Sequence, residues 1–215
     1  MKKKNSKEYA SLLGWLERFS KARILVIGDL MRDIFIWGKV KRISPEAPVP
    51  VVEVMKETAM LGGAANVVNN LVVLGAKVHL AGVVGNDDAG DALVRELEEK
   101  GVELEAVVVE QDRSTSVKTR IIAHSQQIVR FDREVKAPVA PESRARMLAA
   151  LKEILPGVDL ILVSDYAKGV ISPELTRKLF PVAKQYKKKI LVDPKLGTSV
   201  VSREELKDAL KRGGL

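Results

Sequence analysis

The chain alternates between short, continuous apolar runs and longer stretches in which apolar residues recur every three or four positions. Uninterrupted apolar runs are typical of strands buried on both faces of a parallel sheet, and the longer spacing is typical of amphipathic helices. The predicted strands cover residues 23–29, 77–85, 104–109, 159–163 and 189–192. The predicted helices cover residues 64–76, 87–100 and 141–155, and a further helix begins at Ser172. This alternation predicts an α/β fold around a mostly parallel sheet.

Two segments break this rhythm, at residues 34–55 and 116–131. In the first, apolar-rich stretches on either side of the proline-rich sequence SPEAPVP are interpreted as strands, with Ile34 and Ile36 alternating with Phe35 and Trp37. Prolines deny ladder hydrogen bonds and favour an edge or a rigid loop. The segment is interpreted as a lid or a dimer surface at the mouth of the sheet, with a hairpin packed on the core as the alternative.

The second segment reads as a hairpin that carries basic residues on one side. Lys118 and Arg120 share one face of the first strand, and Arg130 lies on the second strand. One interpretation is a basic surface that reaches toward a phosphate. The other is a set of charges that protects an exposed edge strand from pairing.

A glycine pair, Gly62 and Gly63, immediately precedes the helix predicted for residues 64–76. Glycines at a helix start let backbone N–H groups approach a ligand closely, and these N–H groups favour anions or hydroxyl-rich ligands. Asn66 would add one donor and one acceptor to the same ligand. The alternative is a tight turn into a buried helix with solvated asparagines.

Acidic side chains follow several of the predicted strands. Asp29 and Asp33 come after the first strand, Asp165 follows the strand at 159–163, and Asp193 follows the last strand. Because the carboxyl ends of parallel strands meet at one edge of a sheet, Asp29, Asp165 and Asp193 should lie together where α/β enzymes bind ligands. Either Asp29 or Asp33 is a candidate for sugar hydroxyls or a cation, and a loop-capping role is the alternative.

Composition narrows the choice of function. The net charge of +8 comes from scattered lysines and arginines with few aromatic residues, so nucleic-acid binding is not expected. There is no cysteine and there are only two histidines, which excludes thiolate and histidine-rich zinc sites. The chain has no secretory leader pattern and no apolar run of roughly 18 residues, so a cytoplasmic protein without membrane partners is expected.

Several blocks of sequence resemble the ribokinase-like (PfkB-type) sugar kinase family. They are GDLMRD, LGGAAN followed by LGA, and AGVVGNDDAG. Further blocks resemble its heptose 7-phosphate kinase branch, namely RISPEAPVPVV, RIIAHSQQIVRFD, LILVSDYAKG and LVDPK. The resemblance extends over nearly all of residues 23–195.

This resemblance implies a three-layer α/β/α fold with a small β-strand lid, in one truncated kinase domain over residues 1–215. It implies ATP-dependent, Mg2+-assisted phosphorylation of heptose 7-phosphate for lipopolysaccharide precursor synthesis, and a homodimer formed through the lid. Asp193 would lie near the transferred phosphate. The substrate-binding residues that it implies are Asp33, Gly62, Gly63, Asn66, Lys118, Arg120, Arg130 and Asp165.

The sequence departs from the family after Lys195. The family's Asn-x-x-Glu motif and its Gly-Ala-Gly-Asp loop, which carries the catalytic base, do not occur after Lys195, and no P-loop replaces them. Residues from 196 onward instead resemble the family's C-terminal end, which indicates an internal deletion. The catalytic residue is therefore unassigned, and impaired ATP binding and turnover are expected. The alternative function is a non-catalytic sugar-phosphate-binding or dimerisation remnant.

Overall fold

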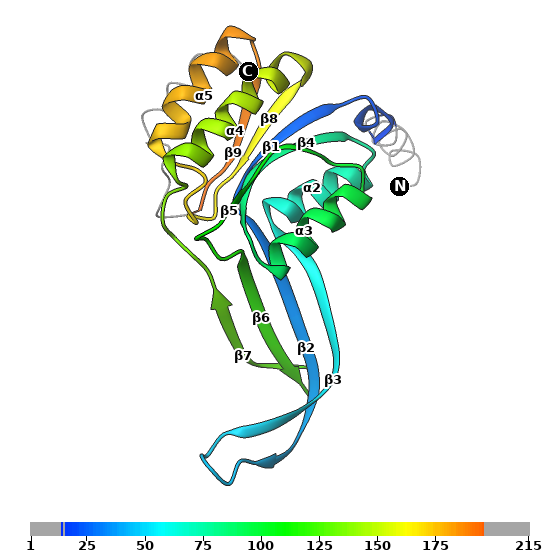
Figure 1. The fold of residues 1–215 in the computed structure, drawn as a ribbon. Coiled ribbons are helices and arrows are strands. Elements are labelled where there is room, and N and C mark those ends of the chain that lie inside the picture. Colours follow the sequence, from blue (N-terminus) through cyan, green and yellow to red (C-terminus); the bar gives the residue numbers. More distant parts are fainter. Residues whose placement is uncertain (1–13, 15, 196–215) are drawn as a thin grey trace.

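The computed structural model describes residues 14 and 16–195 of the chain (Figure 1). Its core is a five-stranded parallel sheet with the strand order β5-β4-β1-β8-β9. The strands are β1 (Arg23–Gly28), β4 (Lys77–Gly85), β5 (Glu103–Glu110), β8 (Leu160–Ser164) and β9 (Lys189–Asp193). Each of the predicted buried runs therefore forms a strand of one parallel sheet, as the sequence pattern indicated.

Helices cover both faces of this sheet and make three layers (Figure 1). The helices are α2 (Ala64–Val73), α3 (Asp88–Glu99), α4 (Pro141–Ile154) and α5 (Pro173–Gln185), with a short 3-10 turn at Leu155–Gly157. Successive residues of β1 point to opposite faces. Ile24 and Val26 therefore pack with α2 and α3, whereas Leu25 and Ile27 pack with α4 and α5.

Two helix starts follow from local sequence chemistry. The Asp87 side chain accepts a hydrogen bond from the backbone N–H of Gly90 at the start of α3. Ser172 does the same for Leu175 at the start of α5, where Pro173 occupies the first turn. Such caps satisfy backbone donors that have no partner inside the helix.

The remaining strands form a second sheet, which projects from the core as the lid (Figure 1). Its order is β3-β2-β6-β7, with β2 (Leu30–Ile43), β3 (Pro50–Gly63), β6 (Ser116–Ala123) and β7 (Gln126–Arg133). The first hairpin is longer than the predicted segment at residues 34–55, because β2 continues directly from the core and β3 runs back to the glycine pair. Asp33 consequently lies within β2 and not in a loop beyond the first strand, as the sequence had suggested.

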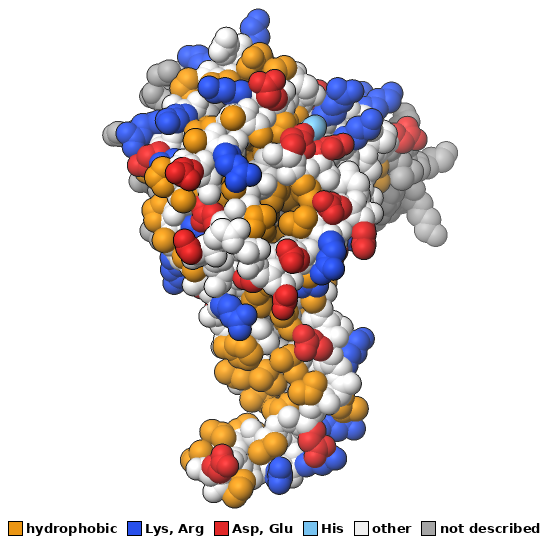
Figure 2. All heavy atoms as spheres, in the orientation of Figure 1, with side chains coloured by type: hydrophobic (Ala, Val, Ile, Leu, Met, Phe, Trp, Pro, Cys, Tyr) orange, Lys and Arg blue, Asp and Glu red, His pale blue; other side chains and the backbone are white. Residues whose placement is uncertain are grey.

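The two faces of the lid differ in chemistry. The site face carries charged side chains and one aromatic ring from three neighbouring strands: Asp33, Phe35, Lys118, Arg120, Arg130 and Asp132. The apolar face carries Ile34, Ile36, Ile121, Val129 and Phe131. Figure 2 shows hydrophobic side chains gathered on the narrow part of the molecule below the core. Phe131 is 53% exposed and Val129 45% exposed.

The sequence SREE at residues 202–205 is typical of a helix start and predicts a last short helix. That helix and the junction after Lys195 lie outside the described residues. Within residues 14 and 16–195, no helix combines the length and the hydropathy that crossing a membrane requires.

Candidate functional site at the lid–core junction

Asp29 connects the elements that surround the carboxyl edge of the sheet. Its carboxylate accepts hydrogen bonds from the backbone N–H groups of Tyr166 (2.8 Å), Lys168 (3.1 Å) and Val170 (3.1 Å). Its carbonyl oxygen accepts from Ala64 N at the start of α2 (3.0 Å). Burial raises the pKa of the Asp29 carboxyl, and these backbone donors offset that effect only in part. Asp29 therefore has the loop-capping role, which the sequence had left open.

The glycine pair forms the turn from the lid into α2. Gly63 has a φ of 55°, which favours glycine, and a Cβ on this residue would meet the Met31 side chain at 2.7 Å. A Cβ on Gly62 would lie 2.5 Å from Asp33 Oδ2. Gly62 thus lets the Asp33 carboxylate approach the backbone at the helix start. Asn66 is exposed two residues into α2, where it is accessible to a ligand.

Asp165 is the buried carboxylate that retains a free acceptor. It is 4% exposed, and its Oδ1 accepts from Ala167 N at 2.8 Å. Its Oδ2 and the neighbouring Ser164 Oγ are buried without a hydrogen-bond partner among residues 14 and 16–195. An unpaired buried acceptor is costly, and it fits a ligand that donates a hydroxyl hydrogen.

The strand order places Asp29, Asp165 and Asp193 at the carboxyl ends of three neighbouring strands, as predicted. Gly28 pairs with Ser164, and Ser164 with Asp193. Asp165 N also donates to the Asp193 carbonyl at 3.0 Å. The Asp193 side chain is exposed at the open edge of the sheet.

On the site face of the lid, Asp33 forms an ion pair with Arg120, with 2.5 Å between Oδ1 and Nη1. The Arg120 guanidinium also lies over the Phe35 ring, 5.2 Å from its centroid. Asp33 and Arg120 are brought together because β2 pairs in parallel with β6. The sequence proposed both residues for the site but gave no sign that they contact each other.

The other basic residues of the site face are also paired. Lys118 Nζ lies 2.9 Å from Asp132 Oδ2 and 3.5 Å from Glu134 Oε2. Arg130 Nε lies 3.1 Å from Asp132 Oδ1. The three proposed basic residues, Lys118, Arg120 and Arg130, therefore share one face as predicted, and each already has a carboxylate partner.

Glu134 joins the lid to the loop that carries Asp165. Its Oε2 lies 2.5 Å from Lys168 Nζ, and its Oε1 lies 3.2 Å from Lys136 Nζ. Burial alone would raise the pKa of the Glu134 carboxyl, but the hydrogen bonds and charges of Lys168 and Lys136 hold that pKa at about 2. The sequence analysis did not single out Glu134 or Lys168.

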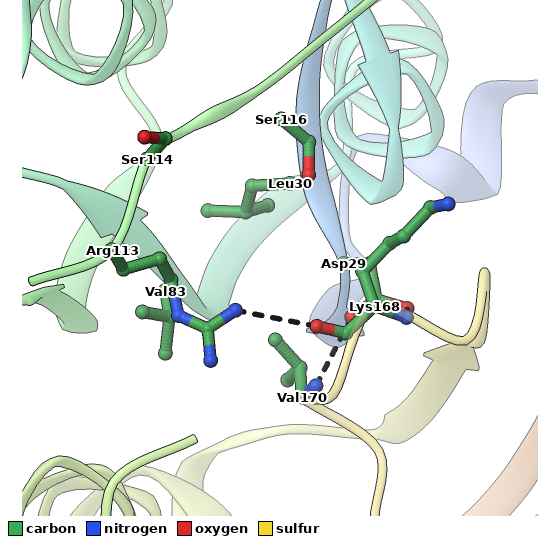
Figure 3. Close-up of a pocket in the computed structure, with 8 residues that line it drawn as sticks. All are labelled: Asp29, Leu30, Val83, Arg113, Ser114, Ser116, Lys168 and Val170. Atoms are coloured by element: carbon green, nitrogen blue, oxygen red, sulfur yellow. Dashed lines mark hydrogen bonds between the residues drawn. The ribbon is translucent and has the colours of Figure 1, made fainter. Parts of the chain in front are cut away.

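Two linkers connect β6 and β7 to the core: the first linker, residues 111–115, and the second linker, residues 134–140. Arg113 of the first linker donates to the carbonyl oxygens of Ala137 (2.8 Å) and Lys168 (3.3 Å). Figure 3 shows the contact with Lys168 beside a cavity of about 10 Å³, close to the room that one water needs. Arg113, itself part of the first linker, therefore connects both linkers to the loop that follows β8 through hydrogen bonds.

Glycines of the core lie against these linkers. A Cβ on Gly85 would clash with the backbone of the first linker, and one on Gly169 would clash with the second. Thr115 donates its N–H to Asp87 (2.9 Å) and accepts from Gly85 N (2.9 Å). The AGVVGNDDAG and DYAKG blocks therefore contain residues that contact the linkers of the lid. From the sequence alone, these blocks were recognised only as family motifs.

The described residues contain no group of three or more His, Cys, Asp or Glu side chains placed to hold a metal ion. A larger open hollow of about 730 Å³ lies at the opposite end of the sheet, beside the starts of β1, β4 and β5. Ligands of open parallel sheets bind at the carboxyl ends of the strands, so this hollow is not the candidate site.

A parallel α/β sheet with a separate β lid beside its carboxyl edge is the architecture of ribokinase-like sugar kinases. The family model described as "pfkB family carbohydrate kinase" matches residues 21–212. The chain therefore belongs to the pfkB family of carbohydrate kinases. Kinases of this family use ATP and a divalent metal.

Among curated proteins, the chain is 48% identical over 173 residues to the bifunctional protein HldE of Helicobacter pylori. That match covers 80% of this chain and 38% of the relative. It is 49% identical over 177 residues to the bifunctional protein HldE of Desulfatibacillum aliphaticivorans, covering 82% of this chain and 36% of the relative. The chain thus spans less than two fifths of the length of these relatives.

Solved structures support the same fold. Phosphofructokinase-2 from Escherichia coli, solved in complex with substrates and products, matches with a TM-score of 0.66 at 20% identity. The match covers 88% of this chain and 57% of that one. Ribokinase from Arabidopsis thaliana, complexed with ribose and ATP, matches with a TM-score of 0.58 at 14% identity, covering 89% of this chain and 68% of that one.

Proposed function

We propose that this chain is the sugar-binding part of a kinase that phosphorylates heptose 7-phosphate at its anomeric hydroxyl. In that reaction the hydroxyl oxygen attacks the γ-phosphorus of ATP, the bond to the ADP oxygen breaks, and a base accepts the hydroxyl proton. The products are heptose 1,7-bisphosphate and ADP, and the former is a precursor for the lipopolysaccharide core. The support is the match of the lid and strand-end motifs to this branch and the identity to HldE proteins.

The observation that carries the proposal is the unpaired Oδ2 of Asp165, buried at the carboxyl edge of the sheet. Asp29 accepts hydrogen bonds from this loop and from Ala64, the residue after the Gly62–Gly63 turn, and thereby joins the two elements that carry the proposed sugar contacts. The basic residues of the site face project from the adjoining lid. Hydroxyls of a sugar suit the carboxylates, and a phosphate suits the lysine and arginine side chains.

In this assignment the residues of the chain bind and orient the sugar. Asp33, Asp165 and Asn66 contact hydroxyls, and Lys118, Arg120 and Arg130 neutralise the phosphate that the sugar already carries. Bound ATP with Mg2+ would supply the phosphoryl group, and Asp193 is the described carboxylate that we assign to its neighbourhood. The family's base aspartate is absent from the sequence, so no proton acceptor is assigned.

Calorimetry with heptose 7-phosphate tests the sugar site. We expect the wild-type chain to bind it, and we expect Asp165→Asn to weaken binding by roughly tenfold or more, the scale of a hydrogen bond to a charged group. Glu153→Gln is the matched control, because it removes an exposed carboxylate at the opposite end of the sheet, beside the hollow that is not the candidate site. Equal affinities for wild type and Asp165→Asn would contradict the assigned site.

A coupled assay for ADP release separates the kinase from the alternative, a non-catalytic sugar-phosphate-binding remnant. Losing one preorganised donor typically costs roughly 10²–10³ in rate, and groups that act as a unit cost more together. We therefore expect this chain alone to bind the sugar phosphate without turnover above background. ATP binding by titration, together with sugar-dependent ADP release, would show that other residues rebuild the phosphoryl-transfer site.

A further inference from the structure

The Asp33 carboxylate, to which we assign sugar hydroxyls, is already engaged by a cation of its own chain. Arg120 Nη1 lies 2.5 Å from Asp33 Oδ1, and both side chains are only 22% exposed. The Phe35 ring lies against one side of the guanidinium, with 5.2 Å between the ring centroid and Arg120 Cζ. A sugar hydroxyl that takes the same carboxylate oxygen must therefore compete with Arg120.

The surroundings of Arg120 favour an anion. Arg120 lies directly opposite Arg130 in the antiparallel β6–β7 pair, and Lys118 lies two residues away on the same face. Like charges directly opposite each other destabilise a sheet. Asp33, Asp132 and Glu134 are the carboxylates paired with these three cations, and Glu134 is shared with Lys168 and Lys136, which leaves an excess of positive charge. A phosphate placed there would relieve the repulsion and would accept paired hydrogen bonds from a guanidinium.

We propose that Arg120 is an exchange residue: it pairs with Asp33 in the ligand-free protein and transfers to the phosphate of a bound sugar phosphate. Transfer frees Asp33 to accept hydroxyl hydrogen bonds. This inference rests on the proposed function, and it adds the reason for the choice of substrate. The site selects phosphorylated sugars because only they bring an anion that draws Arg120 away from Asp33.

The energetics favour this selectivity. The Asp33–Arg120 contact joins two opposite charges, whereas a hydroxyl on Asp33 leaves the Arg120 cation without an anion, so a hydroxyl alone does not compensate the loss of that pair. A sugar phosphate replaces that pair with a phosphate–Arg120 contact and adds the hydroxyl contact to Asp33. An unphosphorylated sugar gains only the second contact.

The test measures binding of heptose 7-phosphate and of unphosphorylated heptose by calorimetry. Arg120→Met removes the cation that competes with the sugar hydroxyl for the Asp33 carboxylate. The same change removes a cation that would bind the phosphate. We expect it to bind unphosphorylated heptose about tenfold more tightly than wild type, and heptose 7-phosphate about tenfold more weakly. If the Asp33–Arg120 ion pair only holds the structure together, Arg120→Met should bind both sugars more weakly than wild type. That result would overturn the inference.

Arg130→Met is the matched control. It removes a neighbouring cation of the same face that pairs with Asp132 and not with Asp33. We expect it to weaken binding of the sugar phosphate without any gain for the unphosphorylated sugar. A gain in both variants would show that charge alone, and not release of Asp33, controls selectivity. Arg120→Gln repeats the test if Arg120→Met does not fold.

Sugar binding by the wild-type protein distinguishes a failure of the proposed function from a failure of the Arg120 exchange. If wild type binds neither sugar, the substrate assignment is wrong, and the exchange is then tested with inorganic phosphate alone. Phosphate should shift the NMR signals of the Arg120 side chain and of the Asp33 carboxyl carbon together. If phosphate leaves the Asp33 signal unchanged, the exchange itself is refuted.

Discussion

At the scale of single residues, two aspartates only four positions apart have different roles. Asp29 is 1% exposed and its carboxylate is used by three backbone N–H groups. Asp33 is partly exposed, and one of its oxygens contacts Arg120. The difference arises because Asp29 ends the buried strand β1, whereas Asp33 lies four residues further along in the lid. Asp29 therefore positions the site, and Asp33 is available to a ligand.

Replacing Asp29 tests this distinction. In Asp29→Asn, an NH2 group replaces one acceptor oxygen, so at least one of the buried backbone donors loses its partner. An unpaired buried donor costs about 1–3 kcal/mol, so we expect the free energy of unfolding to fall by that amount. Urea denaturation measures it. Asp193→Asn, on an exposed side chain, should change stability by no more than about 0.5 kcal/mol. Equal stabilities for the two variants would refute the positioning role.

Replacing Asp33 or Asn66 by alanine tests the ligand contacts. Each change should weaken sugar-phosphate binding by about 1–3 kcal/mol, because a hydroxyl of the bound sugar loses its partner. Both side chains are accessible, so we expect stability to change much less than in Asp29→Asn. Calorimetry measures the affinities. Unchanged affinity in both variants would support a turn without a ligand at the glycine pair.

At the scale of elements, the two linkers determine how the lid is held against the core. Arg113 connects both linkers to the loop after β8, and the Glu134–Lys168 ion pair connects the second linker to the same loop. That loop also carries Asp165. The position of the lid and the position of the Asp165 carboxylate are consequently coupled through a few polar contacts.

Acid should weaken this coupling. The folded-state pKa of Glu134 is about 2, below its ordinary value of 4.5. A carboxyl with a lowered folded-state pKa contributes stability above pH 4.5 and loses that contribution as the pH falls toward 2. The difference in unfolding free energy between wild type and Glu134→Gln should thus be largest near neutral pH and vanish near pH 2.

The control for this measurement is Glu53→Gln. Glu53 pairs with Lys41 at 2.7 Å, but both side chains are more than half exposed, at 53% and 63%. Exposed pairs contribute little, typically below about 1 kcal/mol. Urea denaturation at several pH values should therefore show a pH-dependent difference for Glu134→Gln and almost none for Glu53→Gln. Parallel behaviour of the two variants would contradict a special role for Glu134.

At the scale of the whole molecule, the lid presents two chemically different faces. Its site face carries Lys118, which reaches Glu134 of the second linker, so this face lies toward the core loop. Among the described residues, β6 and the edge strand β7 pack mainly against strands of the lid, and Val129 and Phe131 of β7 are about half exposed. Contiguous apolar surface on a protein marks a place for association. We therefore expect homodimers to form through the lid, with the apolar face at the interface.

Phe131→Glu tests the dimer. A charge on this half-exposed side chain should oppose association because it would be buried without a partner, and the mass from light scattering should fall to that of a monomer. Arg130→Gln, the adjacent position on the site face, should leave the mass unchanged. A monomeric mass for wild type at high protein concentration would rule out the lid dimer.

The sequence by itself determined the elements of this protein, because strands and helices follow from local periodicity. The buried runs and the basic hairpin were readable in that way, and the convergence of Asp29, Asp165 and Asp193 followed from the rule that the carboxyl ends of parallel strands meet at one end of a sheet. Only the tertiary structure decided which of these side chains pair. Arg120 and Asp33 are 87 positions apart, and Val170 and Asp29 are 141 apart. Hydrogen bonds act only at contact distance, so contacts between distant segments depend on strand order and register, which local periodicity does not specify.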